Sequence, residues 1–312
     1  MGSSNIDRLF AIWQALNEDD KNPAAWVTDK KAQDSNWTTL AGDIEGKRTA
    51  LYPFKATVNT WYDSQESGPT SVKRTEPFGY NYPETVGLKY PLTADAKRGV
   101  TNSIKKLYTN LPLEIQRSRA GDENAGDFLL PQAAILRKTT TPEVTANHTE
   151  LVKLTAQLPE PEVLLKESLG DDKPFLKDLA PNGEYLEWLV NVKAEKHALG
   201  GRYSVHFFLN DVQEDNVALW SVSPHHVGAF VPFGQSQETG CENCKDQQES
   251  HMEITGQIPL TIALVERYLA QIIPDLTAAT VVPYLTKNLH WRVEAVSNPD
   301  LKLPRYKYTN WR

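Results

Sequence analysis

The sequence has little cysteine, no long apolar run and no excess of basic residues. Its 312 residues carry a formal net charge of -7, and no basic stretch offsets the acid. This balance argues against a nucleic-acid partner. The longest apolar runs, such as Leu129–Leu130, are far too short to cross a bilayer. The first residues also lack a basic region followed by an apolar stretch, so the sequence predicts a cytoplasmic protein with no secretory signal and no membrane span.

The only cysteines are Cys241 and Cys244, and two cysteines cannot build a disulfide scaffold. Without a secretory signal they favour free thiols, a redox pair or metal ligands. Two thiolates at Cys-x-x-Cys spacing can present both sulfurs to one soft ion, which suits Cu(I). Zinc would need two further ligands, and there is no second Cys-x-x-Cys. A disulfide that closes a turn and a pair of inert thiols are the alternatives. Neighbouring Gly240 and acidic residues predict an exposed, flexible loop.

Three regions differ in composition. The first, residues 1–112, contains a helix from Asn5 to Leu16, an aromatic-rich irregular stretch and a second helix from Ala94 to Tyr108. Residues 113–180 are polar and interrupted by prolines, which predicts a linker with exposed, protease-sensitive tips at 121–126 and 139–142. Within it, helical fragments are conceivable at 148–158 and 162–169. Residues 181–312 form the third region.

The third region has the pattern of short β-strands. Residues 203–209 alternate so that Tyr203 and every second residue after it share one face, with His206 on the other. One helix is predicted from Thr261 to Ile273, with Thr261 as a possible N-cap. Many short strands and one helix indicate a β-sandwich. The predicted strands are 185–192, 203–209, 227–230, 252–255, 290–296 and 306–308.

The opening helix carries a resemblance to a known family. Its residues "NIDRLFAIWQALN" resemble the segment that closes the second copper-binding region of fungal tyrosinases, the type-3 copper monophenol oxygenases. Asn5, Asp7 and Arg8 match the second half of the family pattern His-His-x-Asn-Ile/Val-Asp-Arg-Leu. Gly2 and Ser3 stand where the two histidines would be, and neither can replace imidazole on copper.

The resemblance continues along the chain in five further short motifs. Each motif alone is weak, but six in the family's order make the assignment strong. The five are Phe78–Glu84 ("FGYNYPE"), Ala198–Gly201 with Tyr203–Leu209, Cys241–Cys244, Gly256–Leu264, and Pro283–Leu285 with Asn288–Trp291.

The resemblance implies an α+β chain: the residual helix and loops of a tyrosinase catalytic bundle, a linker, and a haemocyanin-like C-terminal β-sandwich with one helix. It implies that the chain is the C-terminal part of an enzyme that hydroxylates monophenols and oxidises o-diphenols to o-quinones in melanin formation. The implied partner is the tyrosinase catalytic domain, in cis or in trans. Phenolic substrates belong only to the full-length enzyme. Because the copper-ligand segments of that dicopper enzyme are missing, we expect no catalytic residue here and no tyrosinase activity from this chain alone.

The resemblance also assigns roles to residues. The sandwich domain would shield the dicopper site and project an aromatic placeholder into the substrate cavity, with Phe233 favoured over Phe230 and core packing as the alternative role. Cys241 and Cys244 would hold Cu(I) transiently while delivering it, with His251 or the pair His225–His226 as conceivable helpers. The family motif residues with a structural role are Asn5, Asp7, Arg8, Tyr80 and Tyr82.

The seven histidines offer little else. None forms an i, i+4 pair, so ordinary surface or turn positions are the simplest interpretation; they are His148, His197, His206, His225, His226, His251 and His290. A rival function is a stand-alone β-sandwich module that acts as a tyrosinase inhibitor or copper chaperone. Such a module has no reason to keep an amphipathic first helix. The uncovered Trp and Phe of that helix predict weak stability around residues 5–16.

Overall fold

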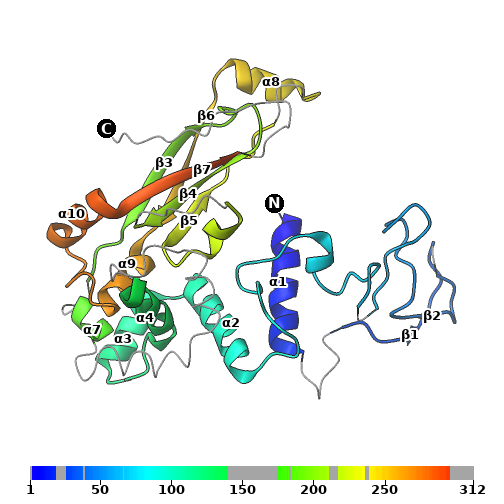
Figure 1. Ribbon diagram of the computed structural model, residues 1–312, viewed down its shortest axis with the longest axis horizontal. Coiled ribbons are helices and arrows are strands. Elements are labelled where there is room, and N and C mark those ends of the chain that lie inside the picture. The colour runs from blue at the N-terminus through cyan, green and yellow to red at the C-terminus, as the bar shows by residue number, and fades with distance from the viewer. Residues whose placement is uncertain are drawn as a thin grey trace. The chain divides into compact units, whose positions relative to one another are not determined.

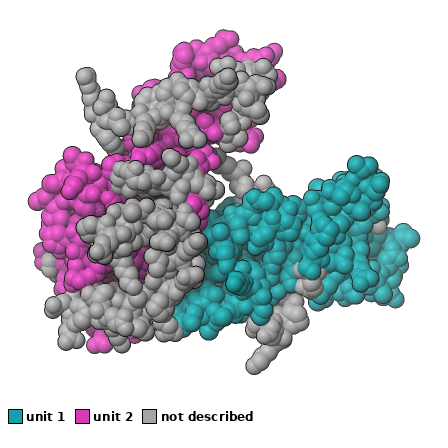
Figure 2. Space-filling view, viewed as in Figure 1, with its two compact units in different colours: residues 1–108 teal, residues 109–312 magenta. Residues whose placement is uncertain are grey.

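The computed structural model describes residues 2–18, 26–37, 39–65, 67–139, 174–180, 182, 184–210, 217–235 and 239–295. The predicted helices 148–158 and 162–169, the tip from residue 140 onward, His148 and the strand 306–308 lie outside these ranges. The chain divides into two compact units, residues 1–108 (unit 1) and 109–312 (unit 2), coloured separately in Figure 2. Within the described ranges, no helix is both long and apolar enough to span a bilayer.

Unit 1 contains the two helices predicted from the sequence. They are α1 (Gly2–Asn17) and α2 (Ala94–Leu107), which pack on each other through a small core (Figure 1). The Thr93 hydroxyl caps α2 by accepting a hydrogen bond from the Ala96 amide at 3.2 Å. Between the helices, the described residues are irregular apart from β1 (Lys30–Lys31), β2 (Ile44–Glu45) and the short 3-10 helix η1 (Glu76–Phe78). The core residues are Ile12, Ala15, Leu92 and Val100.

The aromatic face of α1 is not the face that packs on α2. Phe10 and Trp13 remain 43% and 46% exposed, whereas Ile12 is 6% exposed and Ala15 is fully buried. The helix therefore has apolar residues on two sides, and only one side is covered by α2. The exposed aromatic rings of Phe10 and Trp13 stack on each other with centroids 5.8 Å apart. The low stability predicted for this segment stays a prediction.

Unit 2 is built on two antiparallel sheets. One pairs β3 (Leu189–Glu195) with β6 (Glu253–Pro259), and the other has the order β5–β4–β7. In the second sheet the central strand is β4 (Tyr203–Leu209), flanked by β5 (His226–Phe230) and β7 (Leu289–Ala295). The prediction of a strand over 203–209 is confirmed, and neighbouring predictions differ only in their bounds.

Both faces of β4 are covered, which explains why nearly all of its residues are buried, including His206. Tyr203, Val205, Phe207 and Leu209 belong to the main core of unit 2. On the opposite face, Phe208 packs with Trp220 of the 3-10 helix η3 (Val217–Val222) in a separate small cluster. The predicted alternation is therefore confirmed, and each face has its own apolar partners.

The two sheets touch where glycines allow close approach. A Cβ atom at Gly228 of β5 would lie 2.7 Å from Ile258 of β6, and one at Gly256 of β6 would lie 2.5 Å from the Phe230 ring. Any larger residue at either position would push the strands apart. The chain is thus a mixed helix and sheet protein, as expected. The haemocyanin-like arrangement of a full sandwich stays a proposal.

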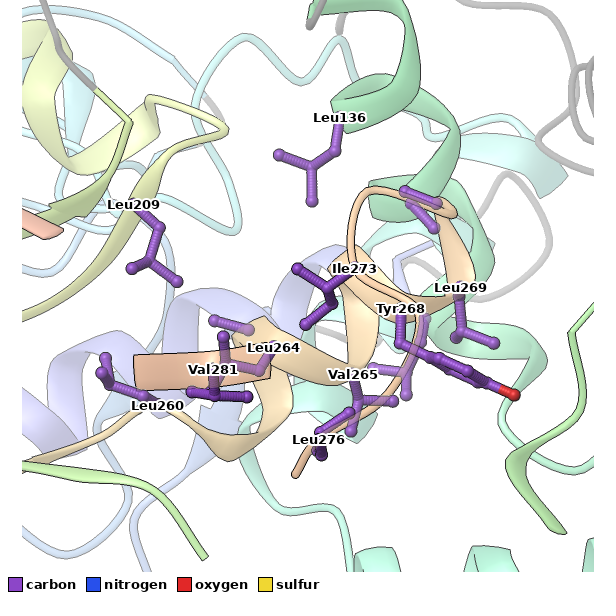
Figure 3. Close-up of a cluster of buried hydrophobic side chains, with 14 of the residues drawn as sticks. Leu136, Leu209, Leu260, Leu264, Val265, Tyr268, Leu269, Ile273, Leu276 and Val281 are labelled. Atoms are coloured by element: carbon purple, nitrogen blue, oxygen red, sulfur yellow. The ribbon is translucent and has the colours of Figure 1, made fainter. Parts of the chain in front are cut away.

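Helices cover one end of these sheets. They include α9 (Thr261–Leu269), which is buried along most of its length, and α10 (Ala278–Asn288), which has Pro283 inside it. Figure 3 shows apolar side chains from α4 (Leu130–Thr139), α9, α10 and the end of β4 converging on one core. The labelled residues are Leu136, Leu209, Leu260, Leu264, Val265, Tyr268, Leu269, Ile273, Leu276 and Val281.

Part of the segment predicted as a linker belongs to this core. Four short elements of this segment contribute one or more buried residues each. They are α3 (Leu111–Arg119) with Ile115, the 3-10 helix η2 (Asp127–Leu129) with Leu129, α4 (Leu130–Thr139) with Leu136, and α7 (Leu176–Leu179) with Leu176. The loop at 121–126 is tied down by the Gly126 amide, which donates to Glu114 at 2.9 Å. The division into 1–112, 113–180 and 181–312 stays a prediction, because half of its middle part lies outside the described residues.

The start of α9 differs from the predicted cap. Its N-cap is Leu260, without a side-chain hydrogen bond, and Thr261 is the first helical residue. The Thr261 hydroxyl accepts from the Trp188 amide at 2.8 Å, so it ties the helix to the segment before β3 instead. The helix ends at Leu269 rather than at Ile273, and Gln271 has a positive φ of 57°.

Candidate functional site around Phe233 and the Cys241–Cys244 pair

The family-motif residues of unit 1 contact one another. Tyr80 donates a hydrogen bond to Asp7 at 2.7 Å, and Tyr82 donates to the same carboxylate oxygen. The Arg8 guanidinium binds Glu84 through two nitrogens, of which Nε lies 3.1 Å from Oε2. These bonds join α1 to the segment after η1, while Asn5 is exposed. The two sequence motifs thus meet in space, and their contacts are those of a structural clamp.

We expect unit 1 to lose stability at alkaline pH because two tyrosines donate hydrogen bonds to Asp7. Burial, followed by the hydrogen bond to Asp7, raises the pKa of Tyr80 and Tyr82 above the ordinary 10.0. A tyrosine with a raised folded-state pKa stabilises the fold below pH 10 and loses that contribution as the pH rises further. We expect Asp7→Asn to move phenolate formation to lower pH in an absorbance titration. Asp95→Asn, at an exposed aspartate of α2, is the control, and coincident Asp7→Asn and wild-type curves would contradict the assignment.

The two candidate placeholder phenylalanines have different surroundings. Phe230, the last residue of β5, is half-buried, and its ring lies against Gly256. Phe233 is 57% exposed, in the loop that follows β5. The ring of Phe230 therefore contributes to the core of unit 2. Phe233 presents an apolar ring to solvent, where it is available to contact another surface.

The loop that carries Phe233 is anchored on both sides of it. Pro232 is buried. A Cβ atom at Gly234 would lie 2.8 Å from the Gly201 carbonyl oxygen and 2.9 Å from that of Lys196, so only glycine fits there. The next residue, Gln235, donates its amide to Nδ1 of the buried His197 at 3.2 Å. Close packing before and after Phe233 fixes the position of its backbone while its ring stays outside.

Cys241 and Cys244 form a disulfide at the start of a helix. Cys241 is the exposed N-cap of α8 (Glu242–Glu249), and its sulfur accepts from the Cys244 amide at 3.2 Å. The loop predicted around this pair is therefore partly a helix. In the disulfide neither sulfur is a thiolate, so this form offers no ligand to Cu(I). Among the predicted alternatives, the disulfide is the one present in the structure.

The histidines named as helpers lie elsewhere. His251 bonds to Glu195 at 3.0 Å, His225 is buried, and His226 bonds to His206. No group of three or more histidine, cysteine or acidic side chains converges on a metal position within the part of the chain that the structure describes. The described residues therefore do not fit a type-3 dicopper centre, and we assign no dicopper chemistry to them.

Helix α8 and the Phe233 loop share hydrogen bonds. Gln248 of α8 donates to the Gln235 carbonyl at 3.4 Å, and Lys196 donates to Gln247 at 2.7 Å. The Lys196 amide also donates to the Met252 carbonyl just after α8. The turn after β3 thus lies between the disulfide-bearing helix and the exposed phenylalanine. The candidate site is this set: the Phe233 loop, its anchors and α8.

Sequence reasoning missed the anchors of the loop. The histidines were expected at surface or turn positions, and His197 does lie in a turn, but it is buried and receives the Gln235 amide. The signal was present in the chain, because His197 directly precedes the motif Ala198–Gly201 whose Gly201 carbonyl lies against Gly234. The contact itself joins residues more than thirty positions apart, so no local pattern reveals it.

Comparisons with known proteins bear on this geometry. Residues 187–307 match the family model described as the tyrosinase C-terminal domain. The tyrosinase of Neurospora crassa is 28% identical over 96% of this chain, and that of Podospora anserina is 31% identical over 84%. The aligned regions cover 48% and 44% of those two proteins, so the chain spans about half the length of the curated relatives it matches.

A more distant relative and a solved structure complete the comparison. Polyphenol oxidase 4 of Agaricus bisporus is 22% identical over 94% of this chain. A structure of mushroom tyrosinase in latent and active forms aligns with 97% of this chain and 42% of its own at 19% identity, with a TM-score of 0.29. A TM-score this low carries no argument about how the elements are arranged. Residues 187–307 thus match the tyrosinase C-terminal domain, and the chain is similar in sequence to fungal tyrosinases along most of its length.

Proposed function

We propose that this chain supplies the shielding part of a fungal tyrosinase and that Phe233 is the side chain which enters the substrate cavity of a catalytic partner. The partner is a tyrosinase catalytic domain, joined in cis or met in trans. The observation that carries the proposal is a 57% exposed phenylalanine on a loop anchored by Gly234 and Gln235.

The chemistry of a phenylalanine ring suits this role. A phenol substrate is a flat aromatic ring with a hydroxyl group, and Phe233 has the same ring without the hydroxyl. It can therefore fill an aromatic-binding cavity by apolar and ring contacts without offering an oxygen to be oxidised. Its fixed backbone reduces the conformational entropy lost on docking. Hydroxylation of monophenols and oxidation of o-diphenols are proposed for the full-length protein, of which this chain would be the C-terminal part.

The test is inhibition in trans. The full chain is added to the copper-loaded catalytic part of a fungal tyrosinase, and the initial rate of o-diphenol oxidation is measured against chain concentration. We expect the rate to fall in a saturable way. Heat-denatured chain is the control for non-specific effects. An unchanged rate at a large molar excess of folded chain would overturn the shielding proposal.

Copper delivery is a second proposed function, favoured by the exposure of Cys241 at the N-terminus of α8. In the reduced chain a Cys241 thiolate at this position would be stabilised by the helix N-terminus and by the Cys244 amide. Two thiolates at this spacing suit Cu(I), carried here as cargo for a catalytic partner. The disulfide must first be reduced by two equivalents of a thiol, which leave as their own disulfide.

The copper proposal predicts that binding follows the redox state of the pair. We expect the chain treated with a thiol reductant, and then freed of it, to take up one Cu(I) per molecule in competition with a chromogenic chelator. The oxidised chain is the matched control and should take up none. Cys241→Ser and Cys244→Ser should each weaken uptake by more than about tenfold, because one thiolate is lost. Equal affinity in the reduced wild type and both variants would rule out the pair as the carrier.

A further inference from the structure

A chain of three titratable side chains crosses the sheet β5–β4–β7 on the face opposite the main core. His206 Nδ1 of β4 lies 3.1 Å from His226 Nε2 of β5, and His206 Nε2 lies 3.3 Å from Glu294 Oε2 of β7. His206 is only 9% exposed and lies edge-on to Trp220 of η3, with ring centroids 5.6 Å apart. The two histidine rings thus meet beneath an aromatic cover.

The partners fix where the protons sit at neutral pH. An ionised Glu294 can only accept, so His206 Nε2 carries the proton that it shares with Glu294. A neutral His206 then has an unprotonated Nδ1, which accepts a hydrogen bond from the Nε2–H group of His226. The order of donation runs from His226 to His206 to Glu294. This is the arrangement that satisfies both contacts with neutral rings.

Acid affects the two rings differently. A first added proton can be held by His226, because an imidazolium still donates from Nε2 to His206. A second proton must go to His206 Nδ1, where it replaces the acceptor with a donor. Two cationic rings would then face each other at a contact that measures 3.1 Å in the structure. The rings must separate for the second proton to be bound.

We propose that the His206–His226 pair is a proton-operated latch that holds the edge strand β5 onto β4 at neutral pH and releases it in acid. The latch lies at an irregular point of that pairing, because the β4–β5 register shifts between Phe207 and Phe208. Beyond this shift Phe208 pairs with His226 itself. Repulsion at the pair therefore acts where the ladder is already irregular.

The groups around the pair set the pH at which it opens. Three groups come from β7: Glu294 bonds to His206, Arg292 is the register partner of His206, and His290 pairs with Phe208. From β5, the His226 ring faces His206. The described residues of η3 carry no titratable group. Burial lowers the pKa of His206 below the ordinary 6.5, and Glu294 partly opposes this. Because the folded pKa is lowered, the opened state binds more protons. The stabilisation is present above pH 6.5 and is lost as the pH falls towards the folded value.

Release of β5 from β4 would also change the position of the Phe233 loop in the candidate site. The strand ends at Phe230, and Phe233 follows three residues later. Release of β5 would loosen the Phe230 ring from Gly256 and thereby free the start of the Phe233 loop. This consequence rests on the proposed function, because it gives the placeholder a control by pH. The latch itself does not depend on Phe233 having any partner.

The latch is tested in the isolated full chain by amide hydrogen exchange, corrected for intrinsic rates, from pH 7 to pH 4. We expect the amides of residues 207–209 and 228–230 to lose protection by about tenfold per pH unit between the open-state pKa of His206, near the ordinary 6.5, and its lower folded pKa. In His226→Gln the glutamine amide can still donate to His206 but cannot hold a proton. Its loss of protection over the same pH range should be smaller than in the wild type, because no second cation faces His206.

A matched control and a second measurement keep the test decisive. His251→Gln removes an exposed histidine that also bonds to a carboxylate, Glu195, and should exchange like the wild type. Protection in β5 that stays constant to pH 4 would overturn the latch, as would equal pH profiles for His226→Gln and the wild type. If His226→Gln does not fold, ring-proton NMR of the wild type decides. Two separated titration steps support the latch, and two independent steps near 6.5 refute it.

Discussion

Replacing Arg267 with alanine is expected to lower the free energy of unfolding of unit 2 by about 3–5 kcal/mol. The side chain is 1% exposed. Its guanidinium donates to the carbonyls of Ala263 and Leu209, both at 2.8 Å, and to the Tyr284 hydroxyl at 2.9 Å. It thus joins α9, β4 and α10 at the centre of the core. Alanine would leave these buried acceptors without their donor and leave a cavity in place of the side chain.

The measurement is urea unfolding followed by circular dichroism. Arg202→Ala, at an exposed arginine just before β4, is the matched control and should change stability by less than about 0.5 kcal/mol. Arg267→Lys keeps the charge but not the planar fork, so we expect an intermediate loss. A loss below about 1 kcal/mol for Arg267→Ala would contradict the view that this guanidinium holds the three elements together.

Replacing Phe233 with alanine is expected to raise the inhibition constant of the chain, in the trans assay described above, by about tenfold to a hundredfold. Central aromatic side chains that enter a pocket carry most of the energy of an interface, and Phe233 is the exposed ring of this loop. The substitution removes no described core contact, so the fold should keep its stability. The loss would come from the missing ring alone.

Two variants separate a plug from a general surface contact. Val231→Ala removes an apolar side chain that is 53% exposed two residues earlier, and should change the inhibition constant by less than about threefold. Phe233→Tyr adds a hydroxyl to the same ring and tests whether the catalytic partner oxidises it. If Phe233→Ala and Val231→Ala weaken inhibition equally, Phe233 has no special role in the contact.

The sequence pattern predicted those helices and strands in which apolar residues recur at a regular spacing. Both helices of unit 1 and the strand β4 were predicted because apolar residues recur at the helical or strand period. The same reasoning predicted that the two faces of β4 differ. It did not predict which side of α1 is covered, because that depends on where α2 packs, and α1 has apolar residues on two sides.

Tertiary packing overrode the pattern in the other helices. Most residues of α3 and all of α4 were assigned to a polar linker because prolines and glycines surround them, yet Ala133 and Leu136 are buried and α4 packs against α9. Helix α10 was not predicted, since Pro283 in its interior is a strong breaker signal. Thr261 was expected to cap α9 because local spacing cannot reveal the Trp188 amide that its hydroxyl accepts from.

The candidate site was only partly visible in the sequence. The family motifs pointed to the loop with Phe230 and Phe233, but the choice between them depends on Gly256, which lies on a different sheet. The histidine pair of the latch was invisible because His206, His226 and Glu294 come from three strands. Cysteine spacing left the disulfide and the thiol pair open, and the structure contains the disulfide.

The most direct measurement of the shielding role is how inhibition by the full chain depends on substrate concentration. If Phe233 occupies the substrate cavity of the catalytic partner, the chain and the o-diphenol compete. The apparent KM should then rise linearly with chain concentration while kcat stays constant. A fall in kcat at unchanged KM would place the contact away from the cavity and contradict the role assigned to Phe233.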